Sequence, residues 1–232
     1  MSPRLDLKKR KSPTIVKLLR CCVALATAML TMPARADVSG NVSNALFIAG
    51  QYCDDTWRAL SKVAIAPGDP DVERAESIAN RLAVALGNGS WRVIVFSYPN
   101  VGWPVMALLG NRILVSKDFI DDSNDDELGF VFAHEMGHVV LGHLPQRYAA
   151  LIADAGGDVT RWTQVVRYAS QEWPLYRREE FEADRYGFAL AAKAGFDASA
   201  GAHTALLHLA PDPQHPTPYE RLSALRLSTV RN

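Results

Sequence analysis

The chain has 232 residues, of which 48% are apolar and 22% are charged, values that are ordinary for one globular domain with its own hydrophobic core. Its formal net charge of zero conceals an asymmetry, because residues 1–36 hold eight of the 25 Lys and Arg and only one of the 25 Asp and Glu. The remaining chain carries 17 basic and 24 acidic residues, a formal charge of −7, which argues against a nucleic-acid-binding surface of clustered Lys and Arg.

The basic start of the chain predicts a signal peptide. A positively charged stretch ends at Arg20, an apolar run covers residues 21–32, and residues 34–36 offer a small-x-small cleavage site. The apolar run is too short for a permanent membrane span, and a retained amphipathic anchor is the alternative. We therefore expect residues 1–36 to be a signal peptide for export to an oxidising compartment, and residues 37–232 to be one mature domain.

The mature domain is expected to be soluble and to fold without a disulfide. Cys53 is the only cysteine after residue 36, so no internal disulfide can form, and we interpret it as a buried structural thiol. No later segment is apolar for long enough to serve as a transmembrane anchor.

From residue 37 onward the pattern predicts mainly helices. Alternating apolar residues predict strands at 91–98 and 112–116, with a Pro/Gly-containing loop between them. Asn124 and Glu127 predict a capping box at the start of the next helix. Helices are expected at about 44–63, 71–86, 124–142, 144–154, 158–170, 174–194, 198–209 and 218–227. The predicted fold is α+β, mainly helical, with a small β-sheet before the 124–142 helix.

The 124–142 helix carries the motif H-E-M-G-H. His134 and His138 are four residues apart, so both rings project from one face of the helix, as two ligands of one zinc ion must. Glu135 lies between them, where a carboxylate can act as general base on a bound water. A coincidental match on the surface of a helix is the alternative.

A catalytic zinc needs a third protein ligand. The chain lacks the histidine that metzincins carry six residues after the second ligand, and His143, five residues after His138, is expected to cap the helix end instead. On a later helix, Glu180 and Asp184 share one face. Either can bind zinc while the other holds a ligand histidine, unless both belong to an ordinary charged surface.

The two motifs H-E-M-G-H-x-x-x-x-H and E-F-E-A-D-R-Y-G resemble those of the HtpX-like zinc metallopeptidases. This gluzincin family includes the CAAX prenyl endopeptidases and the soluble periplasmic BepA-like proteases. The resemblance extends from about Asp71 to Arg226, without added tetratricopeptide repeats, and so indicates a minimal, soluble member with a zincin-like fold. It departs from the family pattern at 101–110, so the strand at the substrate edge is expected to differ there.

The resemblance implies one Zn²⁺ per chain and a set of roles for its residues. Glu180 becomes the third ligand beside His134 and His138, and Asp184 becomes a partner of a ligand histidine. A late His-Pro segment supplies His215 and Arg221 as candidate donors to the oxyanion, with catalytic roles beside the base Glu135. In the BepA-like branch the histidine of this segment can bind the zinc and keep the enzyme latent, and His215 is expected to be able to do so.

The predicted activity is endopeptidase cleavage, with polypeptide substrates added to the edge of the sheet. By analogy with the family, the expected substrates are unfolded or misassembled envelope proteins in the periplasm, with peripheral association with envelope assembly machinery and no nucleic acid partner. The first alternative is a non-proteolytic, chaperone-like zinc module whose site is closed by His215. The second is a structural metal domain that unfolds when the metal is removed. Glu135 argues against both, because metal binding alone needs no base.

Overall fold

The computed structural model describes residues 41–87, 89–97, 104–154, 173–208 and 215–227, all of which belong to the unit Val38–Asn232. The expected signal peptide at 1–36 and the expected helix at 158–170 lie outside the described residues. None of the helices described is both long and apolar enough to cross a lipid bilayer.

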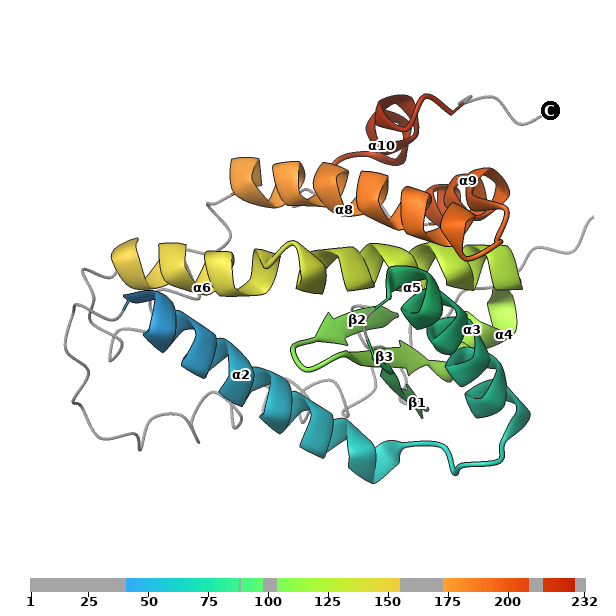
Figure 1. Ribbon diagram of the computed structural model, residues 1–232, viewed down its shortest axis with the longest axis horizontal. Helices are drawn as coiled ribbons and strands as arrows, with labels where there is room; N and C mark the ends of the chain where they lie inside the picture. Colours follow the sequence, from blue (N-terminus) through green and yellow to red (C-terminus); the bar gives the residue numbers. More distant parts are fainter. Residues whose placement is uncertain (1–40, 88, 98–103, 155–172, 209–214, 228–232) are drawn as a thin grey trace, which may run out of the picture. The chain divides into compact units, whose positions relative to one another are not determined.

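The described residues form helices around a small sheet (Figure 1). The α+β, mainly helical fold predicted from the sequence is therefore confirmed. In chain order the elements are α2 (Asn41–Leu60), η3 (Ser61–Val63), α3 (Pro70–Leu86), β1 (Arg92–Phe96), β2 (Val105–Leu108), β3 (Arg112–Ser116), α4 (Lys117–Asp122), α5 (Asp125–Val140), α6 (His143–Asp154), α8 (Trp173–Lys193), α9 (Ala198–His208) and α10 (Pro218–Ala224).

The sheet has the strand order β1-β3-β2, with β1 parallel and β2 antiparallel to β3. Strand β2 was predicted as part of a loop, and that prediction was wrong. The strand has only four residues, and Pro104 directly before it gave the stretch the composition of a loop. Gly110 and Asn111, with φ of 82° and 55°, form the tight turn into β3. The sheet thus has the short strand β2 at one edge, and β3 and α4 follow it in the chain before the helix of the metal motif.

The two faces of the sheet are covered by different helices. One face packs on α3 and α5 through Val95, Val105, Ile113 and Val115. The other face packs against α2, where the free thiol of Cys53 is fully buried, as predicted. The sheet is therefore buried on both sides, and α5 takes its place in the core through its contact with the first face.

Helix α5 is capped by Asn124, whose side chain accepts hydrogen bonds from the amides of Asp126 and Glu127 at 3.0 Å. The second half of the predicted capping box is absent here, because the Glu127 carboxylate is instead 3.1 Å from Nδ1 of His208. This buried carboxylate thus joins the start of α5 to the end of α9. The cap itself is the one that the sequence predicted.

Helix α8 lies alongside α5 (Figure 1), and a glycine lets the two backbones approach closely. A Cβ atom at Gly187 would be 2.6 Å from the backbone nitrogen of His134. At Gly137 a Cβ would meet Tyr186 at 3.2 Å and Ala183 at 3.4 Å. The two motifs of the sequence therefore face each other across the α5–α8 contact, because both carry glycine where the helices touch.

Candidate metal centre

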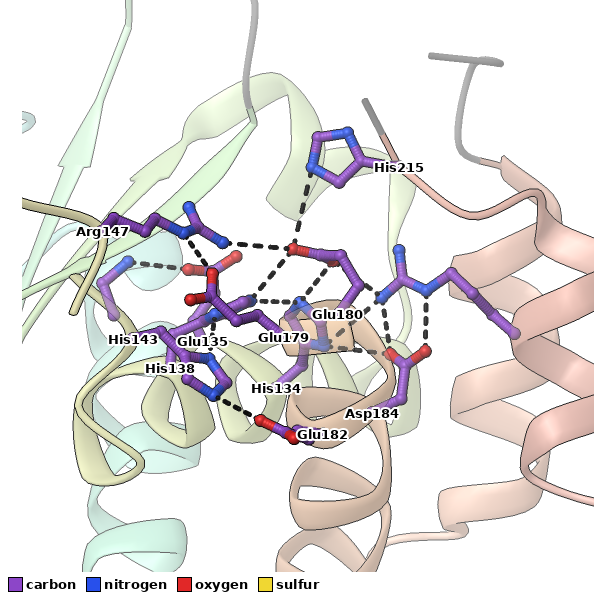
Figure 2. A network of polar contacts seen from close by, with 12 residues as sticks. His134, Glu135, His138, His143, Arg147, Glu179, Glu180, Glu182, Asp184 and His215 are labelled. Atoms are coloured by element: carbon purple, nitrogen blue, oxygen red, sulfur yellow. Dashed lines mark hydrogen bonds and ion pairs between the residues drawn. The ribbon is translucent and has the colours of Figure 1, made fainter. Parts of the chain in front are cut away.

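Helices α5 and α8 bring two imidazoles and one carboxylate to a single point (Figure 2). The Nε2 atoms of His134 and His138 are 3.1 Å apart. Glu180 faces both, with Oε2 3.4 Å from Nε2 of His134 and Oε1 3.3 Å from Nε2 of His138. The ligand atoms of these three residues lie within 4.8 Å of one another, close enough to hold one metal ion.

The other nitrogen of His134 faces a buried ion pair. Nδ1 is 3.0 Å from Oδ1 of Asp184, which is one turn after Glu180 on α8. Arg221 of α10 binds the same carboxylate with two donors, Nη2 to Oδ1 at 2.5 Å and Nε to Oδ2 at 2.7 Å. Asp184 is fully buried and Arg221 is 4% exposed. This pair fixes the ring of His134, because a bidentate guanidinium–carboxylate contact defines the position of the acceptor.

The charges around His134 favour a cation at the cluster. Burial disfavours the charged ring, but the hydrogen bonds with Asp184 and Glu180 outweigh it and raise the pKa of His134 to about 9. Burial likewise opposes ionisation of Glu180, yet the His134 and His138 rings hold its pKa well below the ordinary value. A metal ion would take the place of the proton on Nε2 of His134, where the two carboxylates already stabilise positive charge. The residues present therefore fit a divalent metal.

His138 differs from His134 in its electrostatics. Burial lowers the pKa of His138 to about 4, although the neighbouring Glu180 acts in the opposite direction. Its ring is therefore neutral at pH 7, with a lone pair available on Nε2. A neutral imidazole is the form in which histidine binds zinc.

Glu135 is held by the edge strand of the sheet. Its Oε2 accepts a hydrogen bond of 2.9 Å from the backbone amide of Ala107 in β2. Burial raises the pKa of Glu135, while the nearby His134 ring and the Ala107 amide partly offset the increase. A raised pKa brings a carboxylate nearer to the range in which it can take and return a proton at neutral pH. Glu135 therefore contacts strand β2 from the helix that carries His134 and His138.

Helix α6 contributes two side chains that the sequence analysis did not assign to the site. His143 was predicted to cap the preceding helix, but its Nδ1 lies 2.8 Å from Nδ1 of His138, so that prediction was wrong. Arg147 forms an ion pair with the buried Glu179, and its Nη2 is 3.8 Å from Oε1 of Glu180. The spacing of a continuous helix misled the prediction, because Leu141 and Gly142 interrupt the helix before His143.

His215 lies beside Glu180 at the edge of the cluster (Figure 2). Its Nε2 is 3.8 Å from Oε1 of Glu180, and its side chain is 45% exposed. Arg177 of α8 donates to the backbone carbonyl of His215 at 3.2 Å and pairs with Glu220 at 2.7 Å. The structure therefore places His215 beside the predicted ligands, at the end of an exposed set of polar contacts.

Arg221 was expected to donate to an oxyanion, which stays a prediction, and the structure places its guanidinium on Asp184. Two of its donor nitrogens are engaged by Asp184, and Nη2 is also 3.4 Å from Nδ1 of His134, the nitrogen that faces away from the cluster. Nη2 also lies 3.5 Å from Oε2 of Glu180, so the buried guanidinium holds Asp184 and adds positive charge beside the cluster. The sequence motif could not predict the contact with Asp184, because it indicates that Arg221 lies near the site but not which residue its side chain meets.

Comparisons with known proteins give the same assignment as the paired motifs. The model of the family described as peptidase family M48 matches residues 73–229. Metalloprotease LoiP of Escherichia coli (strain K12) is 29% identical over 153 residues. That match covers 58% of this chain and 58% of the relative, so the chain spans less than two thirds of the relative's length. The predicted resemblance to a zinc-metallopeptidase family is confirmed at the level of this family.

Proposed function

The chain belongs to peptidase family M48, and from this membership we propose that it is a zinc-dependent endopeptidase. One observation carries the proposal: two Nε2 atoms and a carboxylate converge within 4.8 Å, and Glu135 follows the first of these histidines on the same helix. Metal binding alone would need the three convergent residues, whereas hydrolysis also needs a base beside them.

We assign His134, His138 and Glu180 as the ligands of one Zn²⁺, with Asp184 as the partner that orients His134. Two imidazoles and one carboxylate are a ligand set typical of catalytic zinc sites, which keep a further position open. When bound, zinc lowers the pKa of a water molecule and polarises the scissile carbonyl. The fixed Nδ1–H···Asp184 contact of His134 keeps Nε2 directed at the cluster.

Glu135 is the proposed general base. Its carboxylate takes a proton from the attacking water and passes it to the leaving amine after the peptide bond breaks. The Ala107 amide holds one oxygen of this carboxylate, so the base is oriented before the substrate arrives. Arg147 pairs with Glu179 and lies 3.8 Å from Oε1 of Glu180, so it adds positive charge beside the proposed ligand carboxylate.

The substrate is proposed to bind as an added strand along β2. The amide of Ser116 donates to the carbonyl of Pro104, which sets the alternation of the antiparallel ladder. Val105 and Ala107 therefore direct their backbone groups away from β3, and Ala107 directs its amide to Glu135. An extended peptide can pair with this outer edge through its main chain, which demands little of its sequence.

We further propose that His215 controls access to the zinc. Its Nε2 lies 3.8 Å from Oε1 of Glu180, which supports a movement of the side chain that brings Nε2 to the metal. A histidine there would exclude the water and close the site with four protein ligands. From the family resemblance we also propose a role in the cell envelope. The chain would be exported to the periplasm by residues 1–36 and would degrade unfolded or misassembled proteins near the envelope assembly machinery.

The proposal is tested by incubating the zinc-loaded full chain with an unfolded protein and measuring cleavage. Glu135→Gln should lower the cleavage rate by roughly 10²–10⁴-fold, because the base is lost while the ligands remain. The exposed Glu76 on α3 supplies a matched control, Glu76→Gln, which should cleave at the wild-type rate. If His215→Ala cuts faster than wild type, latency is supported as well.

The same assay decides between the peptidase and the chaperone-like module. If wild type, His215→Ala and Glu135→Gln all bind zinc and none of them cuts, the peptidase proposal fails and the chaperone-like module takes its place. If zinc removal unfolds the chain and none of the zinc-loaded variants cuts, the structural metal domain is the better account.

A further inference from the structure

The two ligand histidines have different partners behind them. His134 faces the Asp184 carboxylate through Nδ1, whereas Nδ1 of His138 faces another imidazole, that of His143, at 2.8 Å. His143 in turn has Nε2 3.2 Å from Oε2 of Glu182 on α8. Figure 2 shows the three side chains His138, His143 and Glu182 as one row beside the cluster. We propose that His143 is a positioning residue that holds His138 in the orientation and tautomer needed for metal binding.

The directions of the hydrogen bonds in this row follow from the metal site. If His138 binds zinc through Nε2, a neutral ring carries its hydrogen on Nδ1. That N–H donates to Nδ1 of His143, which must then be an acceptor without a hydrogen. His143 therefore carries its own hydrogen on Nε2, which donates to Glu182. Every nitrogen in the row has a partner, and each ring is restricted to one tautomer.

His143 itself is not placed as a ligand. It meets His138 at the nitrogen opposite to the one that faces Glu180, so it lies behind the ring rather than at the cluster. The two rings are edge to face, with centroids 4.9 Å apart and an interplanar angle of 73°. This geometry directs a ring nitrogen at a ring nitrogen, as a hydrogen bond requires, and the ring is 1% exposed.

The interruption of the helix between α5 and α6 brings His143 to this position. In an uninterrupted helix a residue five positions later lies about 140° around the axis from His138. Gly142 has a φ of 71°, a left-handed conformation that glycine adopts without strain, and α6 starts directly after it. The turn at Gly142 thus returns the first side chain of α6 to His138. It is also a signal in the sequence, because the motif reads H-x-x-x-G-H.

Zinc affinity of the full chain, measured by competition with a chromophoric chelator, tests the inference. His143→Leu keeps an apolar side chain of similar bulk but removes both ring nitrogens, and should weaken Zn²⁺ binding by roughly 10–100-fold. His143→Gln should recover most of the affinity, because its amide oxygen can accept from His138 and its amide nitrogen can donate to Glu182. His203→Leu on α9 is the matched histidine control and should bind zinc as wild type does.

A second measurement separates positioning from packing. The visible absorption of Co²⁺ bound at the cluster reports ligand geometry, and it should change in His143→Leu and return in His143→Gln. Glu182→Ala covers the case in which His143→Leu does not fold, since Glu182 is 37% exposed. It should also weaken zinc binding, because His143 loses the acceptor that fixes its tautomer.

The outcomes separate this inference from the function on which it rests. If wild type binds no zinc at the cluster, the proposed metal site and the inference fail together. If wild type binds zinc and His143→Leu binds it equally tightly with an unchanged Co²⁺ spectrum, the inference alone is overturned. It is also overturned if His143→Gln, although folded, binds as weakly as His143→Leu, or if Glu182→Ala leaves both affinity and spectrum unchanged.

Discussion

The two sides of the metal cluster are built differently. On the closed side, formed by Asp184 and Arg221 behind His134, the two side chains of the ion pair are 0% and 5% exposed. On the open side, formed by His215, Arg177 and Glu220, the side chains are 34–47% exposed. Both sides contain an arginine–carboxylate pair, at 2.5 Å in one case and 2.7 Å in the other.

Similar arginine–carboxylate contacts therefore have opposite consequences on the two sides of the cluster. A buried charge that loses its partner stays desolvated and unpaired, so the closed side resists change. An exposed pair exchanges its partner for water at little cost, so the open side can rearrange. The closed side therefore fixes the ring of His134, while the open side can rearrange as the proposed entry of a substrate and the proposed closure by His215 require. Four substitutions or conditions test this division.

The largest effect is expected from Arg221→Met. It leaves the buried Asp184 carboxylate with the His134 ring as its remaining charged partner, which should lower the free energy of unfolding by roughly 3–5 kcal/mol. Urea unfolding of the metal-free chain measures the loss. The matched control on the open side is Arg177→Met, which removes the arginine from an exposed pair and should cost less than about 1 kcal/mol. Equal losses in the two variants would contradict the division into two sides.

A smaller loss is expected from Gly187→Ala, which acts on the packing of the closed side. The new Cβ would lie 2.6 Å from the backbone nitrogen of His134, so α8 must move away from α5 at a cost of about 1–3 kcal/mol. Zinc affinity should fall with it, because Glu180 and Asp184 are carried by α8. Gly50→Ala on α2, with nothing within 4 Å of the new atom, is the control and should stabilise the chain slightly. An unchanged zinc affinity in Gly187→Ala would show that α8 does not need this close approach.

The features of the site differ in how far the sequence could predict them. The predicted ligands His134 and His138 follow from a spacing of four on one helix. The carboxylate Asp184 was a candidate partner because it is one turn from Glu180. These features are local, because each depends only on two residues four positions apart on one helix.

The features that the sequence did not predict depend on contacts between distant segments or on the interruption of a helix. The position of Arg221 behind His134 depends on how α10 meets α8, which no local pattern encodes. His143 was misjudged because one turn at Gly142 changes its direction by more than its spacing suggests. Strand β2 was missed because four residues after a proline carry too little alternation, although its pairing with β3 is what forms the edge.

On the open side, Arg177→Met should change activity more clearly than stability. Arg177 donates to the carbonyl of His215, so its loss should loosen the segment that holds His215 beside Glu180. If that contact contributes about 1 kcal/mol to a latent state, peptide cleavage should rise up to roughly fivefold. The rate of cleavage of an unfolded protein by the zinc-loaded variant measures this. A second variant, Arg177→Met combined with His215→Ala, should be no faster than His215→Ala alone, and a further increase would place the effect elsewhere.

The smallest effect is expected from the charge of Glu220, whose side chain is 47% exposed. Its carboxylate accepts from the Thr217 amide at 2.7 Å and from the Thr217 hydroxyl at 2.9 Å, and it pairs with Arg177. These contacts lower the pKa of Glu220 to about 2, with the Thr217 amide as the largest cause. A lowered pKa means that the ionised form is favoured in the folded chain. Its contribution to stability is therefore present above the ordinary value near 4.5 and is lost as the pH falls toward about 2.

Glu220→Gln is accordingly expected to lower the thermal midpoint of the metal-free chain slightly at pH 6, with a difference from wild type that shrinks as the pH falls below 4.5. The comparison needs Glu76→Gln as control, because any lost carboxylate changes the net charge by one unit. A difference that stays constant down to pH 3 would mean that the capping contacts of Thr217 do not depend on the ionised carboxylate. The open side would then be held by hydrogen bonds alone, and its ability to rearrange would have to come from the exposed Arg177 contact rather than from charge.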